Sequence, residues 1–169
     1  MRIFNRSVVL VVALIFWKGL APPAIAGDRS GLQWLSFEQG AAEAKRTGKK
    51  ILVDVYTNWC GWCKKMDADT YGNGAVASYL QAHFVLVKLN AESAAPLTYK
   101  GEKYSEQDFA RALGVDGYPT TLFLKADGDP ITKYPGYADA SKFRDVASFI
   151  AEDHYLSKKF DEYVKGRRK

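Results

Sequence analysis

Residues 51–66 read ILVDVYTNWCGWCKKM and hold the only two cysteines of the 169-residue chain, Cys60 and Cys63. The run 51–56 is rich in β-branched and apolar residues, which is typical of a buried strand. Residues 64–68 contain no glycine or proline and continue easily as a helix. The pattern therefore predicts that both cysteines lie where a strand gives way to a helix.

A cysteine in the first turn of a helix meets unpaired backbone N–H groups and the positive end of the helix dipole. Both favour the thiolate, which is the nucleophilic form of the side chain. A second thiol one turn further along can attack a mixed disulfide and resolve it. A bridge between cysteines so close in sequence closes a very short loop and gains little chain entropy, so a purely structural disulfide is a poor explanation. The motif thus predicts thiol–disulfide chemistry.

The first 26 residues have the pattern of a signal peptide. Two arginines precede the apolar run 8–17, and Ala24-Ile25-Ala26 follows as a small-x-small cleavage pattern. We expect export to the bacterial periplasm with cleavage after Ala26, and retention as an uncleaved membrane anchor is the alternative. Lys18 interrupts the apolar stretch, which stays well short of the ~20 residues that a spanning helix needs.

Residues 27–169 are numerous enough to bury a core of their own and predict a single domain. Without residues 1–26 the chain loses three basic residues, and its net charge falls from +5 to +2. So small a charge argues against a dedicated nucleic-acid surface. We expect the basic tail, residues 165–169, to be a solvated end.

The first half of this domain predicts a parallel pair of strands. Ser36 opens a helix with a capping box, and Gly48 ends that helix. Apolar runs predict strands at 51–56 and 84–89, with helical segments between them. Because a strand–helix–strand unit requires a crossover connection, the two strands are expected to pair in parallel.

The second half predicts a hairpin and two further helices. Ser105 caps a short helix, a strand at 120–125 enters a hairpin, and Ser141 opens a last helix whose core-facing stripe includes His154. Residues 91–103 are polar and show no clear period, so we expect a loop there. This order of elements predicts an α/β fold with a mixed sheet and helices on both faces.

The cysteine motif and its surroundings resemble the thioredoxin superfamily. Trp59 directly precedes the first cysteine, Asp54 lies six residues before that cysteine, and Lys88 falls in the next strand. Gly-Tyr-Pro-Thr, residues 117–120, comes before the hairpin. The resemblance covers residues 34–150 and implies a thioredoxin-like fold, with a central mixed sheet flanked by helices on both faces.

Two features differ from ordinary thioredoxin. The dipeptide between the cysteines is Gly61-Trp62 instead of Gly-Pro, and the stretch 91–103 is longer than the corresponding connection. In both respects the chain is more similar to exported thioredoxin-like proteins and to the soluble thiol-donating domains of bacterial membrane electron-transfer systems.

The resemblance implies roles for the reactive residues. Cys60 is expected at the exposed helix tip as the nucleophile, with Cys63 as a more buried resolving thiol. Asp54 matches the family's buried acid and is expected to accept the proton of Cys63, because burial raises a carboxyl pKa toward the range of a general base. The alternative for Asp54 is a structural acid paired with Lys88. Lys88 is expected either as a solvated strand-end lysine or as a residue that tunes Asp54.

Three further residues are expected to support the site. Pro119 matches the family's cis-proline, so its bond to Tyr118 is expected to be cis, with nearby backbone left to pair with a substrate peptide. Trp62 is expected to contact the incoming disulfide or to pack over the helix end. Trp59 is also expected to support the site, because it is the aromatic residue directly before the motif.

Trp62 also bears on the direction of electron flow. An indole carries no charge and accepts no proton, so it cannot stabilise a thiolate as a histidine in its place would. Less thiolate stabilisation means a lower reduction potential. We expect a reductant or electron shuttle that acts on disulfide-containing proteins, uses no cofactor and is re-reduced by a membrane electron-transfer partner.

Two other classes of function stay open from the sequence. Cys60, Cys63 and Met66 form Cys-x-x-Cys-x-x-Met, and all three are soft ligands suited to Cu(I), although a methionine at helical spacing is more often core. Zinc would need two more ligands, and both histidines lie on distant predicted elements. The second alternative is a redox-silent binding or chaperone module on the same scaffold, although such modules usually lose a cysteine.

Overall fold

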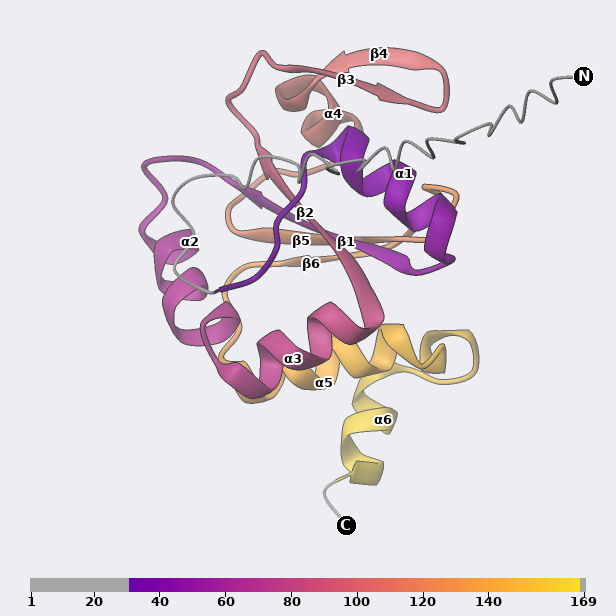
Figure 1. The fold of residues 1–169 in the computed structure, drawn as a ribbon. Helices are drawn as coiled ribbons and strands as arrows, with labels where there is room; N and C mark the ends of the chain where they lie inside the picture. The colour runs from indigo at the N-terminus through magenta and orange to yellow at the C-terminus, as the bar shows by residue number, and fades with distance from the viewer. Residues whose placement is uncertain (1–30, 168–169) are drawn as a thin grey trace, which may run out of the picture.

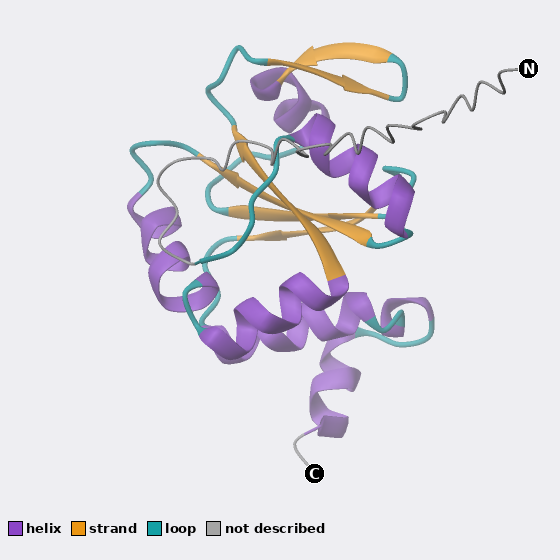
Figure 2. Cartoon of the chain, in the orientation of Figure 1, coloured by secondary structure: helices purple, strands orange, loops and turns teal. Residues whose placement is uncertain are grey.

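The computed structural model describes residues 31–167. The predicted signal peptide and the last two residues of the predicted tail lie outside this range. A four-stranded sheet runs through the centre of the molecule (Figure 1, Figure 2). Its strands, in spatial order, are β2 (Phe84–Asn90), β1 (Lys50–Tyr56), β5 (Thr120–Leu124) and β6 (Pro130–Pro135). β1 pairs in parallel with β2, while β5 pairs antiparallel with both β1 and β6, which confirms the predicted mixed sheet and hairpin.

Helices cover both faces of this sheet, as predicted (Figure 1). The helices on one face are α1 (Phe37–Thr47) and α4 (Glu106–Ala112), and those on the other are α3 (Gly74–His83) and α5 (Ala140–Ala151). Each face has its own buried apolar cluster, so the sheet separates two cores. The architecture is a three-layer α/β fold.

The local signals for α1 are present as the sequence predicts. The Ser36 hydroxyl accepts the Gln39 N–H, and the Gln39 side chain accepts the Ser36 N–H, which completes the capping box. Gly48 ends the helix in the left-handed region with φ of 72°. These caps fix both ends of the helix that leads into β1.

The alternation of β1 directs its side chains to the two cores in turn. Val53 and Val55 pack in the core with α1 and α4, and Leu52 packs in the core with α3 and α5. Asp54 follows the period of Leu52 and contacts Tyr71, which belongs to the same core. The alternation of side chains along β1 therefore buries the Asp54 carboxylate on the face of the sheet that α3 and α5 cover.

The expectation of a loop at residues 91–103 was wrong. A second, two-stranded sheet forms there, from β3 (Pro96–Tyr99) and β4 (Glu102–Ser105). Lys100 and Gly101 join the strands with φ of 51° and 86°, and positive φ at both positions is the requirement of the tightest hairpin turn. Leu97 is buried with Phe109 of α4, and the rings of Tyr99 and Tyr104 also pack against Phe109, so three side chains tie the hairpin to the core.

The C-terminal expectations need two corrections. α5 is capped by Asp139, whose side chain accepts the Lys142 N–H, so the helix begins before Ser141. It is also not the last helix, because η2 (His154–Leu156) and α6 (Phe160–Arg167) follow. Asp153 adopts a left-handed φ of 59° and places His154 outside α5. The His154 ring contacts Glu152 at 3.1 Å near the surface and is not part of a core-facing stripe.

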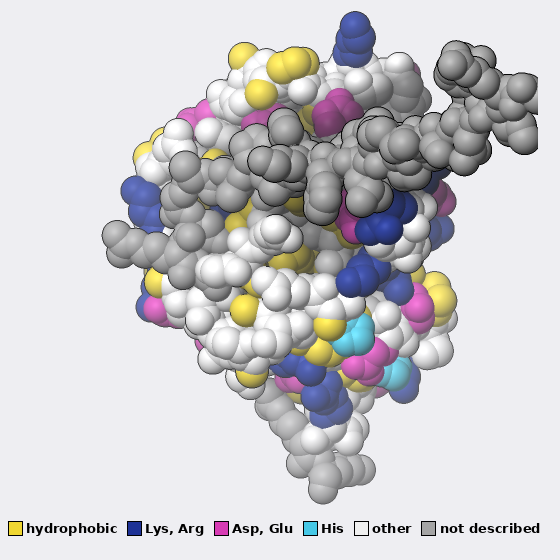
Figure 3. All heavy atoms as spheres, viewed as in Figure 1, with side chains coloured by type: hydrophobic (Ala, Val, Ile, Leu, Met, Phe, Trp, Pro, Cys, Tyr) yellow, Lys and Arg dark blue, Asp and Glu magenta, His cyan; other side chains and the backbone are white. Residues whose placement is uncertain are grey.

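Charged side chains of both signs are interspersed over the face shown in Figure 3. Within residues 31–167, none of the helices combines the length and the apolarity that crossing a membrane requires. The alternative of an uncleaved anchor concerns residues outside this range.

Candidate active site

The two cysteines are joined as a disulfide at the start of α2 (Gly61–Met66), directly after β1. This is the strand-to-helix junction that the sequence predicts. Their Cα atoms lie 5.3 Å apart, and Cys60 is the N-cap residue of the helix. The Cys60 sulfur accepts the backbone N–H of Cys63 at 3.0 Å. A helix donor is thus directed at the sulfur that the sequence assigns as the nucleophile.

The burial of the two sulfurs differs from the expectation. Cys60 and Cys63 are each only 4% exposed, so Cys60 is not the more exposed cysteine in the disulfide form. The residues beside them are open to solvent instead, since Trp59 is 66% and Trp62 is 58% exposed. A reacting partner therefore meets indole rings before it meets sulfur.

Each tryptophan of the cysteine motif packs against a tyrosine from another part of the chain. Trp59 packs edge-on against Tyr118 with ring centroids 6.1 Å apart, and its indole N–H donates to Glu92 at 2.8 Å. Trp62 lies 5.4 Å from the ring of Tyr137, next to the β5–β6 hairpin. The Trp62 ring therefore contacts an aromatic side chain from outside α2.

Pro119 is buried at the start of β5, and the Tyr118–Pro119 peptide bond is cis. The Pro119 carbonyl accepts the Gly136 N–H at 2.8 Å. That carbonyl is therefore engaged within the protein, and the pairing of neighbouring backbone with a substrate stays a prediction.

The chain after α2 forms a wide turn under the cysteines. η1 (Asp67–Tyr71) is a π-helix, in which the Gly72 N–H reaches back to the Asp67 carbonyl. Single π-turns of this kind occur frequently at functional sites. This one carries Asp67 and Tyr71 at its two ends, and both side chains enter the polar cluster around Asp54.

Lys88 lies at the centre of that cluster and is buried, so the expectation of a solvated lysine was wrong. Its ammonium nitrogen is 3.5 Å from the Asp54 carboxylate and 2.5 Å from the Asp67 carboxylate. The nitrogen also lies over the rings of Trp34 and Tyr56, at 4.9 and 5.5 Å from their centroids. Two carboxylates and several aromatic faces thus surround one buried cation.

Sequence reasoning missed Asp67, which is the nearer carboxylate to Lys88. Its backbone N–H donates to the Cys63 carbonyl, so Asp67 connects the cysteine helix to the buried cluster. The spacing could have revealed it, because residues four apart on a helix lie on the same face and Asp67 is four residues after Cys63.

The pKa of Asp54 is raised from an ordinary 3.8 to about 6. Burial is the main cause, because it penalises the charged carboxylate, and the positive charge of Lys88 opposes it. The charge of Asp67 raises the pKa of Asp54 further. A carboxyl that titrates near neutral pH suits proton transfer. Its role as the proton acceptor for Cys63 stays a prediction.

Met66 is 1% exposed and belongs to the core that includes Leu52 and Phe123. This is the ordinary structural role that helical spacing favours. Within the described part of the chain, histidine, cysteine and acidic side chains form no group of three or more that could hold a metal ion.

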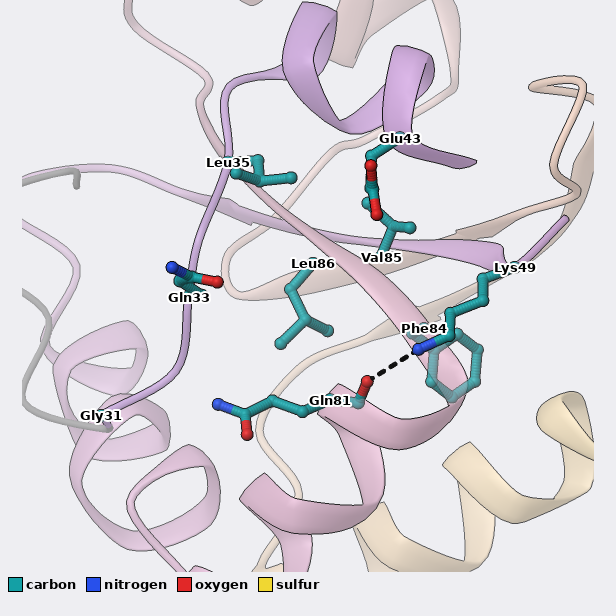
Figure 4. A pocket seen from close by; sticks show the side chains of 9 residues that line it. All are labelled: Gly31, Gln33, Leu35, Glu43, Lys49, Gln81, Phe84, Val85 and Leu86. Atoms are coloured by element: carbon teal, nitrogen blue, oxygen red, sulfur yellow. Dashed lines mark hydrogen bonds between the residues drawn. The ribbon is translucent and has the colours of Figure 1, made fainter. Parts of the chain in front are cut away.

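A pocket of about 500 Å³ lies elsewhere, between α1, β2 and α3 (Figure 4). Both charged side chains that line it are engaged within the protein, since Glu43 pairs with Arg46 and Lys49 donates to the Gln81 carbonyl at 3.1 Å. None of the cysteine-site residues lines it. The pocket therefore has no reactive group, and the cysteine site remains the candidate active site.

A mixed sheet between two helical layers, with a Cys-x-x-Cys disulfide at the first strand–helix junction, defines the class of thioredoxin-fold proteins. A family model described as a thioredoxin-like domain matches residues 37–151, so the chain belongs to the thioredoxin-like domain family. The resemblance inferred from the sequence is confirmed.

Curated relatives are similar to this chain over part of their length. Thiol:disulfide interchange protein DsbD of Vibrio cholerae is 29% identical over 143 residues, which cover 81% of this chain and 21% of DsbD. Protein disulfide-isomerase 5-2 of Arabidopsis thaliana is 34% identical over 104 residues, which cover 61% of this chain and 20% of that protein. The chain thus spans about a fifth of the length of these relatives.

Solved structures share the fold. A putative disulphide-isomerase from Bacteroides thetaiotaomicron superposes with a TM-score of 0.57 at 26% identity, covering 76% of this chain and 93% of that one. A thioredoxin-fold protein from Helicobacter pylori gives a TM-score of 0.59 at 23% identity, covering 71% and 80%. The second likeness shows the fold alone.

The raised pKa of Asp54 predicts a pH-dependent stability. The folded protein holds this proton more tightly than the unfolded chain, so the contribution of Asp54 to stability is greatest below pH 4 and is lost as pH rises toward and through 6. The difference between 3.8 and about 6 corresponds to about 3 kcal/mol. Asp54→Asn is therefore expected to be more stable than the wild type at pH 7.5, by up to about 3 kcal/mol, with the advantage gone near pH 4.

Urea unfolding of the oxidised protein between pH 4 and 8 measures this difference. Asp69→Asn is a matched control, because Asp69 forms an exposed ion pair with Lys65 and its loss is expected to cost under ~1 kcal/mol without altering the pH profile. An Asp54→Asn variant that is less stable than the wild type at pH 7.5 would mean that the ionised carboxylate stabilises the fold.

Proposed function

We propose that this protein is a thiol–disulfide oxidoreductase that exchanges electrons with protein disulfides through Cys60 and Cys63. The observation that carries the proposal is the Cys60 sulfur at the N-cap of α2, accepting a helix N–H beside a second cysteine. Similarity to proteins named thiol:disulfide interchange protein and protein disulfide-isomerase supports it.

The reduced protein begins the reaction as a Cys60 thiolate and a Cys63 thiol. The thiolate attacks one sulfur of the substrate disulfide, and the other substrate sulfur leaves as a thiolate that takes up a proton. Cys63 then loses its proton to Asp54 and attacks Cys60 in the mixed disulfide. The second substrate sulfur leaves, so the substrate gains two electrons and the protein returns to the disulfide form.

The aromatic surface suits a protein substrate. Because both cysteines are nearly buried, a partner must bring its sulfur on an extended or protruding segment. Trp59 and Trp62 offer such a segment two exposed indole rings next to the cysteines, and each indole packs against a tyrosine, Tyr118 or Tyr137. Indole faces contribute large contact area at low cost in side-chain entropy.

The proposed direction is toward reduction of substrates outside the cytoplasm. Trp62 brings no charge to stabilise the Cys60 thiolate, which lowers the reduction potential. Similarity to part of DsbD favours a membrane electron-transfer protein as the source of electrons. Export with cleavage after Ala26 and a single mature domain of residues 27–169 belong to the same proposal.

The first prediction of this proposal is catalysis of insulin reduction. With dithiothreitol as electron donor, the protein is expected to increase the rate at which released insulin chains precipitate and the solution becomes turbid, because Cys60 passes electrons to the insulin disulfides. Cys60→Ser is expected to abolish the acceleration, since no nucleophile remains. Cys63→Ser is expected to stop turnover and to accumulate the mixed disulfide, which non-reducing electrophoresis resolves.

Trp62→Ala serves as a control, because it keeps both sulfurs and is expected to retain measurable turnover. A wild-type protein with no turnover and tight Cu(I) binding would favour the copper alternative. Absence of both activities would favour a redox-silent binding module.

The second prediction concerns the reduction potential, measured by equilibration with glutathione redox buffers. A reductant or shuttle is expected to lie near thioredoxin, at ~−270 mV. Trp62→His is expected to raise the potential, because an imidazolium next to Cys60 stabilises the thiolate. A wild-type value near ~−120 mV would make the protein a strong oxidant and would contradict the proposed direction.

A further inference from the structure

The Thr57 side-chain hydroxyl, three residues before Cys60, has no hydrogen-bond partner. Thr57 is 1% exposed at the end of β1, and its Oγ1 is the single buried side-chain polar atom in residues 31–167 that lacks a partner. Leaving a buried hydroxyl unpaired costs free energy, and native proteins seldom do so. The position of this group next to a redox-active pair suggests that its partner forms in the other redox state.

The backbone holds Thr57 and Cys60 in one turn. The Cys60 N–H donates to the Thr57 carbonyl at 3.2 Å, so the two residues are the ends of a β-turn and their Cα atoms lie within about 7 Å. Both side chains are almost completely buried. In the disulfide form the hydroxyl bonds neither sulfur. A change of the Thr57 side-chain rotamer can direct it toward the Cys60 sulfur of the same turn once the disulfide opens.

The acceptor strength of that sulfur changes with redox state. When a dithiol reductant opens the disulfide, two electrons enter the protein and the Cys60–Cys63 bond breaks. The products are the Cys60 thiolate, the Cys63 thiol, the reductant's own disulfide and one released proton. A disulfide sulfur is uncharged and a weak acceptor, whereas the thiolate carries a full negative charge in a buried site and needs donors.

We propose that the Thr57 hydroxyl donates a hydrogen bond to the Cys60 thiolate in the reduced protein. The inference rests on the redox function proposed above and names a residue that tunes the reduction potential of the cysteine pair. The Cys63 N–H already donates to this sulfur, and Thr57 adds a second donor from the strand side. The bond favours the reduced state, because the same hydroxyl is unpaired when the disulfide forms.

Thr57→Val tests the proposal, because valine keeps the shape of the side chain and removes only the hydroxyl. In a Cys63→Ser background, the absorbance of the thiolate at 240 nm reports the pKa of Cys60 alone. The variant is expected to raise that pKa by about one unit, as loss of a bond to a charged group predicts. In the protein with both cysteines, the glutathione equilibrium is expected to shift about tenfold toward the disulfide, which is ~30 mV.

Two controls separate this role from a structural one. Thr57→Ser keeps the hydroxyl and is expected to keep the pKa of Cys60 near the wild-type value. Thr70→Val removes another fully buried hydroxyl, which donates to the Ala138 carbonyl at 2.6 Å, and is expected to lower stability in both redox states without moving the pKa or the potential.

An unchanged pKa and an unchanged glutathione equilibrium in Thr57→Val would overturn the proposal. Equal loss of stability in the oxidised and reduced forms would also overturn it, because that is the signature of a structural hydroxyl. The proposed function fails separately: a wild-type protein without insulin turnover contradicts that function, while the pKa measurement on the cysteine variants still decides the role of Thr57.

Discussion

At the start of α2 the Cys60 sulfur accepts the backbone N–H of Cys63, and this contact depends on the rest of the fold. β1 ends one turn earlier, and the Thr57 carbonyl fixes the Cys60 N–H, so strand and helix meet at a defined angle. The central position of β1, between a parallel and an antiparallel neighbour, holds this junction rigidly. The sulfur is therefore placed by backbone geometry, which costs no reorganisation when charge develops on it.

Near the cysteine helix, the fold buries charged side chains, which costs desolvation free energy. Asp54 and Lys88 are buried, and the partly exposed Asp67 contacts the same lysine. Replacing such a group by apolar residues is often neutral or stabilising, so stability alone does not explain it. Burial raises the pKa of Asp54 to about 6, and Lys88, which lies 1 Å closer to Asp67 than to Asp54, offsets this rise only in part. The proposed role of Asp54 as proton acceptor for Cys63 requires a carboxyl that binds and releases a proton near neutral pH, and this arrangement supplies one.

The sequence predicts much of this fold because its local signals agree with one another. The capping box at Ser36, the apolar strands and the order of elements together determine the mixed sheet, and the cysteines fall where predicted. The hairpin at Lys100-Gly101 was missed because its turn lacks asparagine or aspartate and Leu97 is the only fully buried residue of its two strands. The four-residue spacing places Asp67 on the face of the cysteine helix that carries Cys63, but its contact with Lys88 follows from the π-turn and the strand register, which no local pattern shows. Burial of Cys60 depends on the packing of surrounding elements, which sequence spacing does not encode.

The central claim is that Cys60, and not Cys63, is the poised nucleophile. Its most direct test is the alkylation of the reduced protein by iodoacetamide at pH 7, with the modification of each cysteine followed by mass spectrometry. The account predicts that Cys60 reacts at least about tenfold faster than Cys63, because only its thiolate is stabilised at the helix start. Equal and slow modification of both cysteines, as in an unstructured peptide, would contradict it.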